Sequence, residues 1–205
     1  MTEPQIHALF PTSIVKTNIG RKFTDAESLF VMEHSKDTVT NMGNTTSRDN
    51  YVFKQDVMKD LHKAALDAVN LYMKDVLNAT DEVTPYVTQS WLNYTKPGEY
   101  HHKHEHPNSF LSGVIYINAD PKKDKIHFYN NRYKQIKVEY KDWNWWNSDS
   151  WWFEVKTGAI IIFPSHLTHM VEQTESEDTR ISLAFNTFVK GTIGNNFELT
   201  ELITK

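Results

Sequence analysis

The sequence predicts a mainly β protein of the α+β class, in which N-terminal helices precede an antiparallel β-core shaped as a sandwich or barrel. Two patterns lead to this class. Between Gln55 and Asn78, apolar residues recur at three- and four-residue spacing, which is typical of an amphipathic helix with one face on a core. From Tyr86 onward, the chain changes to short runs of aromatic and β-branched residues separated by turn signals, a pattern that indicates a β-sandwich or barrel.

The first half of the chain is expected to add one strand and a second, shorter helix. Residues 6–19 are predicted as an opening strand that a proline interrupts, because proline donates no ladder hydrogen bond. Thr24 and Glu27 have the spacing of a capping box, which predicts a short helix over residues 25–35. Residues 36–50 are rich in Thr, Asn, Ser and Asp and are expected to form a connecting loop.

The second half of the chain is expected to supply the strands of the core. Each predicted strand is an apolar or β-branched run bounded by polar residues, glycine or proline. The most continuous apolar run, which begins at Gly158, is expected to be buried on both faces. The strands are predicted over residues 86–95, 110–117, 125–129, 133–140, 158–163 and 181–189.

Residues 142–153 contain five of the six tryptophans and show no clear period. They form either a loop that contacts a substrate, since large rigid rings give contact area at low entropic cost, or an insertion that packs on the barrel. The first alternative makes Trp145 and Trp146 candidates for substrate binding. The acidic neighbours Asp142 and Asp149 argue against stacking on a nucleic-acid base.

The composition excludes several classes of function. The 205 residues include no cysteine, which excludes disulfides, thiolate metal sites and cysteine nucleophiles, so a metal site must use His, Asp or Glu. A net charge of −4 does not favour a nucleic-acid partner. The chain has neither an apolar run long enough for a membrane span nor a secretory signal, so we expect a cytoplasmic protein. The oligomeric state stays open, with a homodimer as one option.

Four of the ten histidines lie between residues 101 and 106, and two of them, His104 and His106, are separated by one residue. In an extended strand, residues two apart point to the same face, so these two imidazoles could bind one metal ion together. A barrel could bring His169, which follows a buried strand and a Pro-Ser turn, opposite this pair as a third ligand. Ligation requires neutral imidazole, so metal affinity is expected to fall as the pH drops through about 6.5.

Arg180 begins the last strong strand and shares one face of that strand with Ser182. We expect this face to point into the barrel, where a buried arginine needs an anionic partner and the strand itself offers no acid. A ligand carboxylate would satisfy it bidentately, with Ser182 as a second donor. If the segments on either side of the acidic turn at residues 172–178 formed a hairpin, Arg180 would return close to His169. The alternative is a surface arginine that pairs with the acidic turn.

Together these motifs resemble the iron(II)/2-oxoglutarate-dependent oxygenases, and more closely the oxygenase family of this type that is common in marine bacteria and their phages. The resemblance runs from residue 90 to residue 186, with the motifs in the expected order. The matching stretches are Ser90-Trp91-Leu92-Asn93, His104-Glu105-His106-Pro107-Asn108-Ser109, Ser112-Gly113-Val114-Ile115-Tyr116, Gly158, Phe163-Pro164-Ser165, His169 and Arg180-Ile181-Ser182-Leu183-Ala184-Phe185-Asn186.

The resemblance implies a double-stranded β-helix, or jelly-roll, core over residues 86–190, buttressed by helices within residues 1–80. Residues 1–205 would then form a single oxygenase domain. The implied activity is that of an Fe(II) enzyme that uses 2-oxoglutarate as its co-substrate and hydroxylates either a protein side chain or a small molecule.

The resemblance also assigns roles to individual residues. His104, His106 and His169 match the metal ligands of the family. Arg180 matches the arginine that binds the far carboxylate of 2-oxoglutarate, and Ser182 would assist it.

One position departs from the family pattern. The usual facial triad has two histidines and one carboxylate, with the carboxylate at the third position of His-x-Asp/Glu, where this chain has His106. In a regular strand Glu105 would point away from the metal, and only a local bulge would turn it inward. His102 is the other candidate to replace His106. The departure keeps two hypotheses open: a cupin-type metal enzyme that does not use 2-oxoglutarate, and a non-catalytic interaction module whose contact surface is the tryptophan-rich loop.

Overall fold

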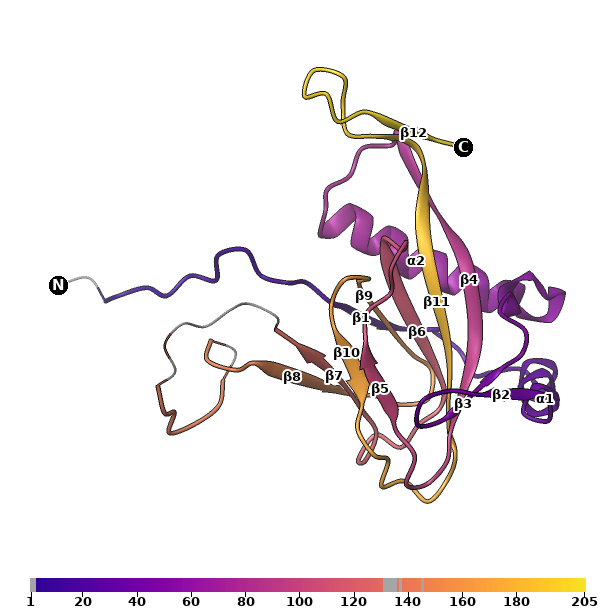
Figure 1. Cartoon of the computed structure of the whole chain (residues 1–205). Coiled ribbons are helices and arrows are strands. Elements are labelled where there is room, and N and C mark those ends of the chain that lie inside the picture. Colours follow the sequence, from indigo (N-terminus) through magenta and orange to yellow (C-terminus); the bar gives the residue numbers. More distant parts are fainter. Residues whose placement is uncertain (1–2, 131–135, 137, 145) are drawn as a thin grey trace.

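The protein contains two antiparallel sheets, which form a jelly roll (Figure 1). The computed structural model describes residues 3–130, 136, 138–144 and 146–205. The smaller sheet consists, in spatial order, of β5 (His101–His104), β10 (His169–Val171), β7 (Lys125–Tyr129) and β8 (Ser150–Glu154). The larger sheet consists of β1 (Val15–Asn18), β9 (Ala159–Pro164), β6 (Leu111–Asn118), β11 (Arg180–Ile193), β4 (Val83–Thr95), β3 (Thr45–Ser47) and β2 (Thr38–Thr40), with β12 (Leu202–Thr204) paired to β11. The predicted fold class is confirmed.

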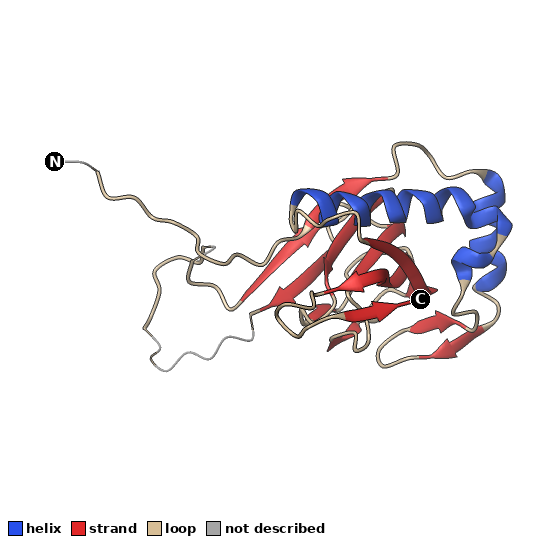
Figure 2. Ribbon diagram, turned by 90° about the horizontal axis from the view of Figure 1, so that it is seen from above, coloured by secondary structure: helices blue, strands red, loops and turns tan. Residues whose placement is uncertain are grey.

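Two helices precede the main strands. The predicted capping box is present at the start of α1 (Asp25–His34): Glu27 N donates to Thr24 Oγ1 at 3.1 Å, and Thr24 N donates to Glu27 Oε2 at 2.8 Å. The longer helix, α2 (Lys59–Asp75), lies along one face of the larger sheet (Figure 2). Two short 3-10 helices, Val52–Lys54 and Asp56–Met58, lead into it. Among the described residues, no helix is long and apolar enough to cross a membrane.

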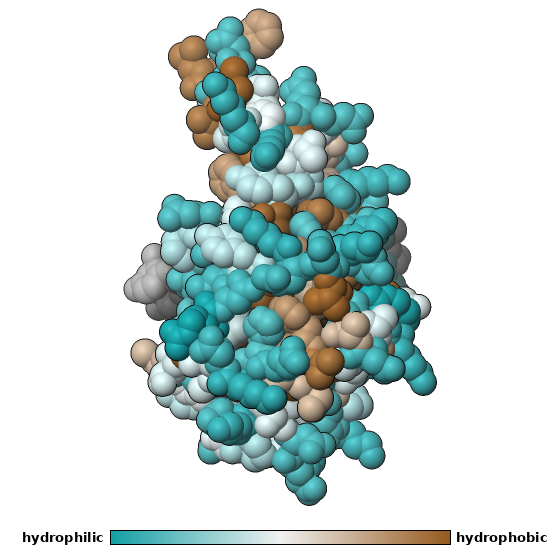
Figure 3. Space-filling model, turned by 90° about the vertical axis from the view of Figure 1, so that its right-hand side faces the viewer, coloured by the Kyte–Doolittle hydropathy of each residue, from teal (hydrophilic) through white to brown (hydrophobic). Residues whose placement is uncertain are grey.

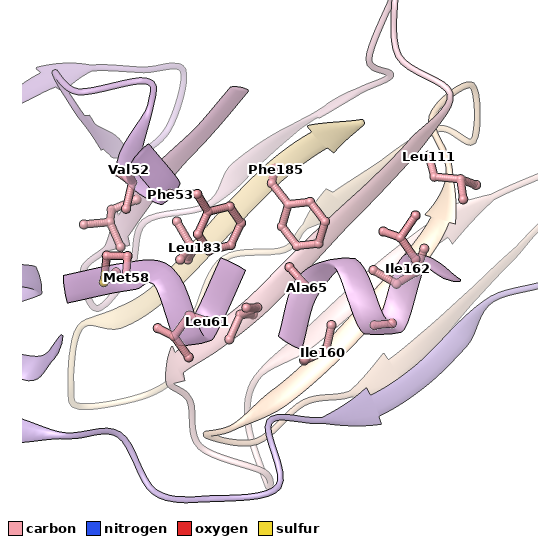
Figure 4. Close-up of a cluster of buried hydrophobic side chains, with 14 of the residues drawn as sticks. Val52, Phe53, Met58, Leu61, Ala65, Leu111, Ile160, Ile162, Leu183 and Phe185 are labelled. Carbon is pink, nitrogen blue, oxygen red and sulfur yellow. The ribbon is translucent and has the colours of Figure 1, made fainter. Parts of the chain in front are cut away.

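The face of the larger sheet that meets α2 is apolar. Alternate residues of β6, β9 and β11 point toward this helix (Figure 4). Gly113 makes the packing possible, because a Cβ atom at this position would lie only 2.1 Å from Phe185 Cζ. The cluster includes Leu61, Ala65, Val69 and Tyr72 from α2, and Leu111, Ile115, Ile160, Ile162, Leu183 and Phe185 from the sheet.

The opposite face of the larger sheet points to the interior between the sheets. The intervening residues of the same strands, such as Val114 on β6 and Ile161 on β9, pack there against Ile126 and Phe128 of β7. The strand at residues 159–164 is therefore buried on both faces, as predicted.

The segment predicted as a connecting loop and the tryptophan-rich segment both contain strands. β2 and β3 form a hairpin within residues 36–50 and extend the larger sheet beyond β4. Their threonines are β-branched residues that favour strands, but the polar composition of the hairpin hides this tendency. In the tryptophan-rich segment, β8 pairs with β7, so Trp151 and Trp152 belong to the smaller sheet.

The N-terminal region also differs from the prediction. The opening strand is shorter than expected, since β1 covers only Val15–Asn18, and Phe10 before it is 83% exposed. Near the other end, β12 projects from the body with Phe197 and Leu199 exposed, and Figure 3 shows the brown hydrophobic atoms at this projecting end.

Of the strand predicted over 133–140, residues 133–135 and 137 lie outside the described residues, and 138–140 form no strand.

Candidate metal centre

Strands β5 and β10 bring two histidines of the predicted site side by side. The strands are antiparallel, and His104 on β5 is the direct partner of His169 on β10. Their ring centroids lie 4.3 Å apart, and the ring of His106 lies 5.0 Å from that of His104 and 4.9 Å from that of His169. Each histidine offers one ring nitrogen within 4.8 Å of those of the other two. The three residues predicted as metal ligands therefore form one cluster.

His106 reaches this cluster from outside the strand. Because β5 ends at His104, the strand geometry that was expected to align His104 with His106 does not extend to the second residue. The backbone N–H of His106 instead donates to Ser165 O at 3.0 Å, which ties the segment after β5 to the turn after β9. With this backbone hydrogen bond, the His106 imidazole lies beside those of His104 and His169, as strand alternation had been expected to place it.

The hydrogen bonds of His104 and His169 leave one nitrogen of each ring available. His104 Nδ1 lies 2.7 Å from His102 O, and His169 Nδ1 lies 3.0 Å from Leu167 O. A carbonyl oxygen can only accept, so both Nδ1 atoms carry the ring proton and both Nε2 atoms keep a lone pair. Backbone carbonyls thus fix these rings in the state that binds a metal.

The spacing of the nitrogens fits a single metal ion. His104 Nε2 and His106 Nε2 lie 3.1 Å apart. Two imidazole nitrogens bound to one ion at about 2.1 Å and at a right angle would lie about 3.0 Å apart. Imidazole nitrogen binds iron as well as zinc, copper and nickel, so the donor set fits Fe(II) without selecting it.

Burial keeps the cluster neutral near pH 7. Burial, assisted by the nearby His104, lowers the pKa of His106 to about 4 and the pKa of His169 to about 3. Burial also lowers the pKa of His104. The expected loss of metal affinity around pH 6.5 therefore moves to lower pH, because these rings stay neutral where a free histidine would become protonated.

A second histidine cluster shares His104 with the first but is less suited to a metal. Ring nitrogens of His101, His102 and His104 also lie within 4.8 Å of one another. However, His101 Nε2 lies 3.2 Å from the amide nitrogen of Asn41, which uses the lone pair that a metal would need. Glu105 belongs to neither cluster: its carboxylate accepts a hydrogen bond from Thr168 Oγ1. The cluster of His104, His106 and His169 therefore contains neither His102 nor Glu105.

Arg180 lies at the start of β11 and is only 4% exposed. Its Nε has no hydrogen-bond partner, and the described part of the chain offers it no ion pair. The guanidinium lies 5.1 Å from the centre of the Tyr116 ring. The alternative of a surface arginine paired with the acidic turn is therefore wrong. A buried cation without a counter-charge costs stability, which favours an anionic ligand beside it.

The path of the chain between His169 and Arg180 differs from the prediction. β10 and β11 belong to different sheets, so the expected hairpin does not form, and residues 172–179 cross from the smaller sheet to the larger one. Burial is the main cause that lowers the pKa of His101 on β5 to about 2, and the positive charges of the neighbouring histidines and of Arg180 contribute to this value.

Three adjacent strands place buried polar side chains on the interior face that carries Arg180. Ser182 on β11 is flanked in register by Asn93 on β4 and Tyr116 on β6, and all three are buried. Asn93 Oδ1 has no hydrogen-bond partner. Burial raises the pKa of Tyr116 to about 12 although Arg180 opposes the shift, so the phenol keeps its proton and can donate it. The positions of Asn93 and Tyr116 beside Ser182 were not predicted, because they follow from cross-strand register, which has no local sequence signal.

A cavity of about 430 Å³ adjoins the histidine cluster at His106. Its wall includes Leu77 after α2, Phe110 before β6 and His166 after β9. Trp146 is 60% exposed and Trp145 lies outside the described residues, so their contact with a substrate stays a prediction.

The segment that carries these residues matches a known family. Residues 89–186, just under half of the chain, match the family described as "Putative 2OG-Fe(II) oxygenase". The matched segment includes the three clustered histidines, Arg180 and Ser182. No curated protein sequence gives a significant match.

Solved structures of similar fold include a 2OG-Fe(II) oxygenase family oxidoreductase from Burkholderia pseudomallei (TM-score 0.56, 13% identity, covering 85% of this chain and 83% of that one). HygX from Streptomyces hygroscopicus, with nickel, 2-oxoglutarate and hygromycin B bound, gives a TM-score of 0.59 at 11% identity over 86% of this chain and 82% of its own. A Pseudomonas putida prolyl-4-hydroxylase gives a TM-score of 0.51 at 14% identity, over 85% of this chain and 92% of its own. At these identities the likeness shows the fold alone.

Proposed function

We propose that the chain is a member of the 2OG-Fe(II) oxygenase family, whose model its residues 89–186 match, and that it hydroxylates an organic substrate at a three-histidine Fe(II) centre. One observation carries the proposal: three imidazoles present nitrogens within 4.8 Å of one another in the same barrel that buries the unpaired Arg180. The first feature suits a metal ion and the second suits a carboxylate, which are the two ligands that this family requires.

In the proposed site, His104, His106 and His169 hold Fe(II) through their Nε2 atoms. Arg180 binds the far carboxylate of 2-oxoglutarate, because it is a buried cation that lacks an anionic partner. Ser182 and the phenol of Tyr116 are hydrogen-bond donors beside it, and an arginine pairs best with a carboxylate when such neighbours complete the shell.

Bound Fe(II) would supply the activation of dioxygen that is coupled to decarboxylation of 2-oxoglutarate to succinate. The protein orients the co-substrate through Arg180 and keeps water from the reacting atoms through burial of the site. It also keeps the ligating imidazoles neutral, since burial lowers the pKa of His106 and of His169 well below the ordinary histidine value.

The prime substrate is proposed to enter through the cavity beside His106. The volume of this cavity, about 430 Å³, lies within the usual range for small-molecule sites, about 300–1,000 Å³. The same opening would admit an extended protein side chain, so both substrate classes stay open. Substrate contact by Trp145 and Trp146 remains a separate prediction.

The remaining assignments are proposals of the same kind. We propose that residues 1–205 act as one domain, because α2 packs on the sheet that carries Arg180. A cytoplasmic location in a bacterium or a phage-infected host, a homodimeric state and the absence of a nucleic-acid partner rest on the sequence alone.

The proposal is tested by adding Fe(II) and then 2-oxoglutarate to the protein without oxygen. A chelate of 2-oxoglutarate on Fe(II) is expected to give a weak visible charge-transfer band. If iron binds but the band does not appear, 2-oxoglutarate is not the co-substrate. If no metal binds at all, the three-histidine centre itself is refuted.

A further inference from the structure

The side chains around the cavity beside His106 restrict what can enter it. Among the described residues, those that line the cavity include no Asp, Glu, Lys or Arg. Much of the wall is apolar, with Leu77 after α2, Phe110 and Leu111 at the start of β6, and Pro164 at the end of β9. A charged group in this cavity would lose hydration and meet no counter-charge on the wall, which is costly.

The backbone around the cavity also offers few hydrogen-bond donors. Pro107 and Pro164 have no N–H group. The N–H of Phe110 donates to Thr187 O at 2.8 Å, and the N–H of Leu111 donates to Thr187 Oγ1 at 3.3 Å. These positions in the wall therefore present no N–H to an anion, unlike the backbone of a phosphate or carboxylate site.

Two of the polar side chains in the wall are already used within the protein. The Tyr72 hydroxyl donates to a backbone carbonyl at 3.3 Å. Ser109 Oγ donates to a backbone carbonyl at 3.2 Å and accepts from Ser165 Oγ at 2.7 Å. Asn108 and His166 are instead exposed, so their side chains can meet a ligand. The wall thus combines a mainly apolar surface with a small number of hydrogen-bonding groups.

We infer that the part of the prime substrate that enters this cavity is uncharged and mainly apolar: a hydrocarbon ring or chain that Asn108 and His166 orient through hydrogen bonds. The inference rests on the proposed function, because it takes the cavity beside His106 as the entrance to the metal centre. It narrows both substrate classes. A small molecule would enter through an apolar part, and a protein substrate would enter through an uncharged side chain.

The test uses three fluorinated probes of similar size that differ in charge. They are 4-fluorobenzyl alcohol, 4-fluorobenzylamine, which is a cation near neutral pH, and 4-fluorobenzoate, which is an anion. Binding to the metal-free protein is measured by ¹⁹F NMR titration, and the anion is compared with the alcohol in Arg180→Met, which removes the buried cation that would attract it. The alcohol should bind about 10-fold more tightly than either charged probe, because the wall offers a charge no partner.

A matched pair of variants locates the binding. Leu77 lines the cavity and is 44% exposed, whereas Leu71 on α2 is 40% exposed and lies outside the lining. Leu77→Asp adds a carboxylate to the wall, so it should weaken the alcohol by about 10-fold and strengthen the cation. Leu71→Asp should change neither. Asn108→Ala should weaken the alcohol but not 4-fluorotoluene, which has no hydroxyl group.

The position of the bound alcohol relative to the metal centre is measured with Co(II), and Zn(II) serves as the control. Both ions bind imidazole nitrogen, but only Co(II) is paramagnetic. Co(II) should therefore broaden the ¹⁹F signal of the bound alcohol, and Zn(II) should not.

The inference is overturned if the alcohol does not bind, if a charged probe binds as tightly, or if Leu77→Asp and Leu71→Asp have the same effect. It is also overturned if Co(II) binds to the protein without broadening the signal, since the cavity would then not lead to the metal centre. Failure of the protein to bind Co(II) would instead refute the metal centre, and the metal-free titrations would still decide which chemistry the cavity accepts.

Discussion

The two faces of the larger sheet are made by the same strands but differ in chemistry: one is apolar and packs on α2, and the other holds buried polar groups. On β11, Leu183 and Phe185 point to α2 and are fully buried among apolar side chains. Arg180 and Asn93, on the interior face, each keep a buried polar atom without a partner. A fully buried leucine or phenylalanine side chain contributes about 1.5–3 kcal/mol, whereas an unsatisfied buried polar group costs about 1–3 kcal/mol. The apolar packing on the helix-facing side therefore offsets the cost of the polar groups that lack hydrogen-bond partners on the other side.

The largest expected effect comes from breaking the helix-facing side. Leu183→Ala removes a fully buried side chain beside α2 and should lower the free energy of unfolding by about 2–5 kcal/mol, measured by urea denaturation. Because the residue has no polar role, Co(II) affinity per folded molecule should stay unchanged. A loss of affinity without a loss of stability would contradict the division between the two faces.

On the interior face, a substitution is expected to weaken ligand binding and to leave the free energy of unfolding undiminished. Arg180→Met removes the buried cation and keeps an apolar side chain of similar length, so 2-oxoglutarate binding should weaken by about 1.5–3 kcal/mol, the range for hydrogen bonds to charged groups. Calorimetric titration of the Fe(II)-loaded protein without oxygen measures this loss. The free energy of unfolding should not fall, since the removed charge has no counter-charge within the described structure. Unchanged co-substrate affinity would refute the role of Arg180.

The smallest effect concerns the pH dependence of a single interior histidine. Burial lowers the pKa of His106 from its ordinary value of 6.5 to about 4, so the folded state binds fewer protons than the unfolded state between these values. Stability of the metal-free protein must then fall as the pH drops below 6.5, by at most about 1.4 kcal/mol per pH unit for one histidine. His106→Gln should reduce this slope in urea denaturation across that range. An identical slope in variant and wild type would show that His106 titrates normally.

Parts of the site could be predicted because they follow local rules. The alternation of β11 put Arg180 and Ser182 on one face and its apolar residues on the other, as observed. His169 was identified as the distant third histidine, and the structure pairs it directly with His104.

Other parts could not be predicted because they depend on long-range register. Tyr116, for example, acquires its place beside Ser182 only from the pairing of β6 with β11. A similar limit explains His106, whose position depends on a backbone bond to Ser165 and not on strand alternation. The β2–β3 hairpin was not predicted for a different reason. Its polar composition indicates a loop, and only the pairing of β3 with β4 makes it part of the sheet.

The central position of β11 has a consequence for how the protein is made. β11 follows β4 and β6 in the sequence, yet it lies between them in the sheet and pairs Gly191 with Val83, far apart in the chain. Until β11 emerges from the ribosome, β4 and β6 keep an unpaired edge each, and such edges invite pairing with other chains. The larger sheet therefore cannot close before β11 has been made, and non-local pairing of this kind is slow. The nascent protein is most exposed to aggregation after β6 has been made and before β11 pairs.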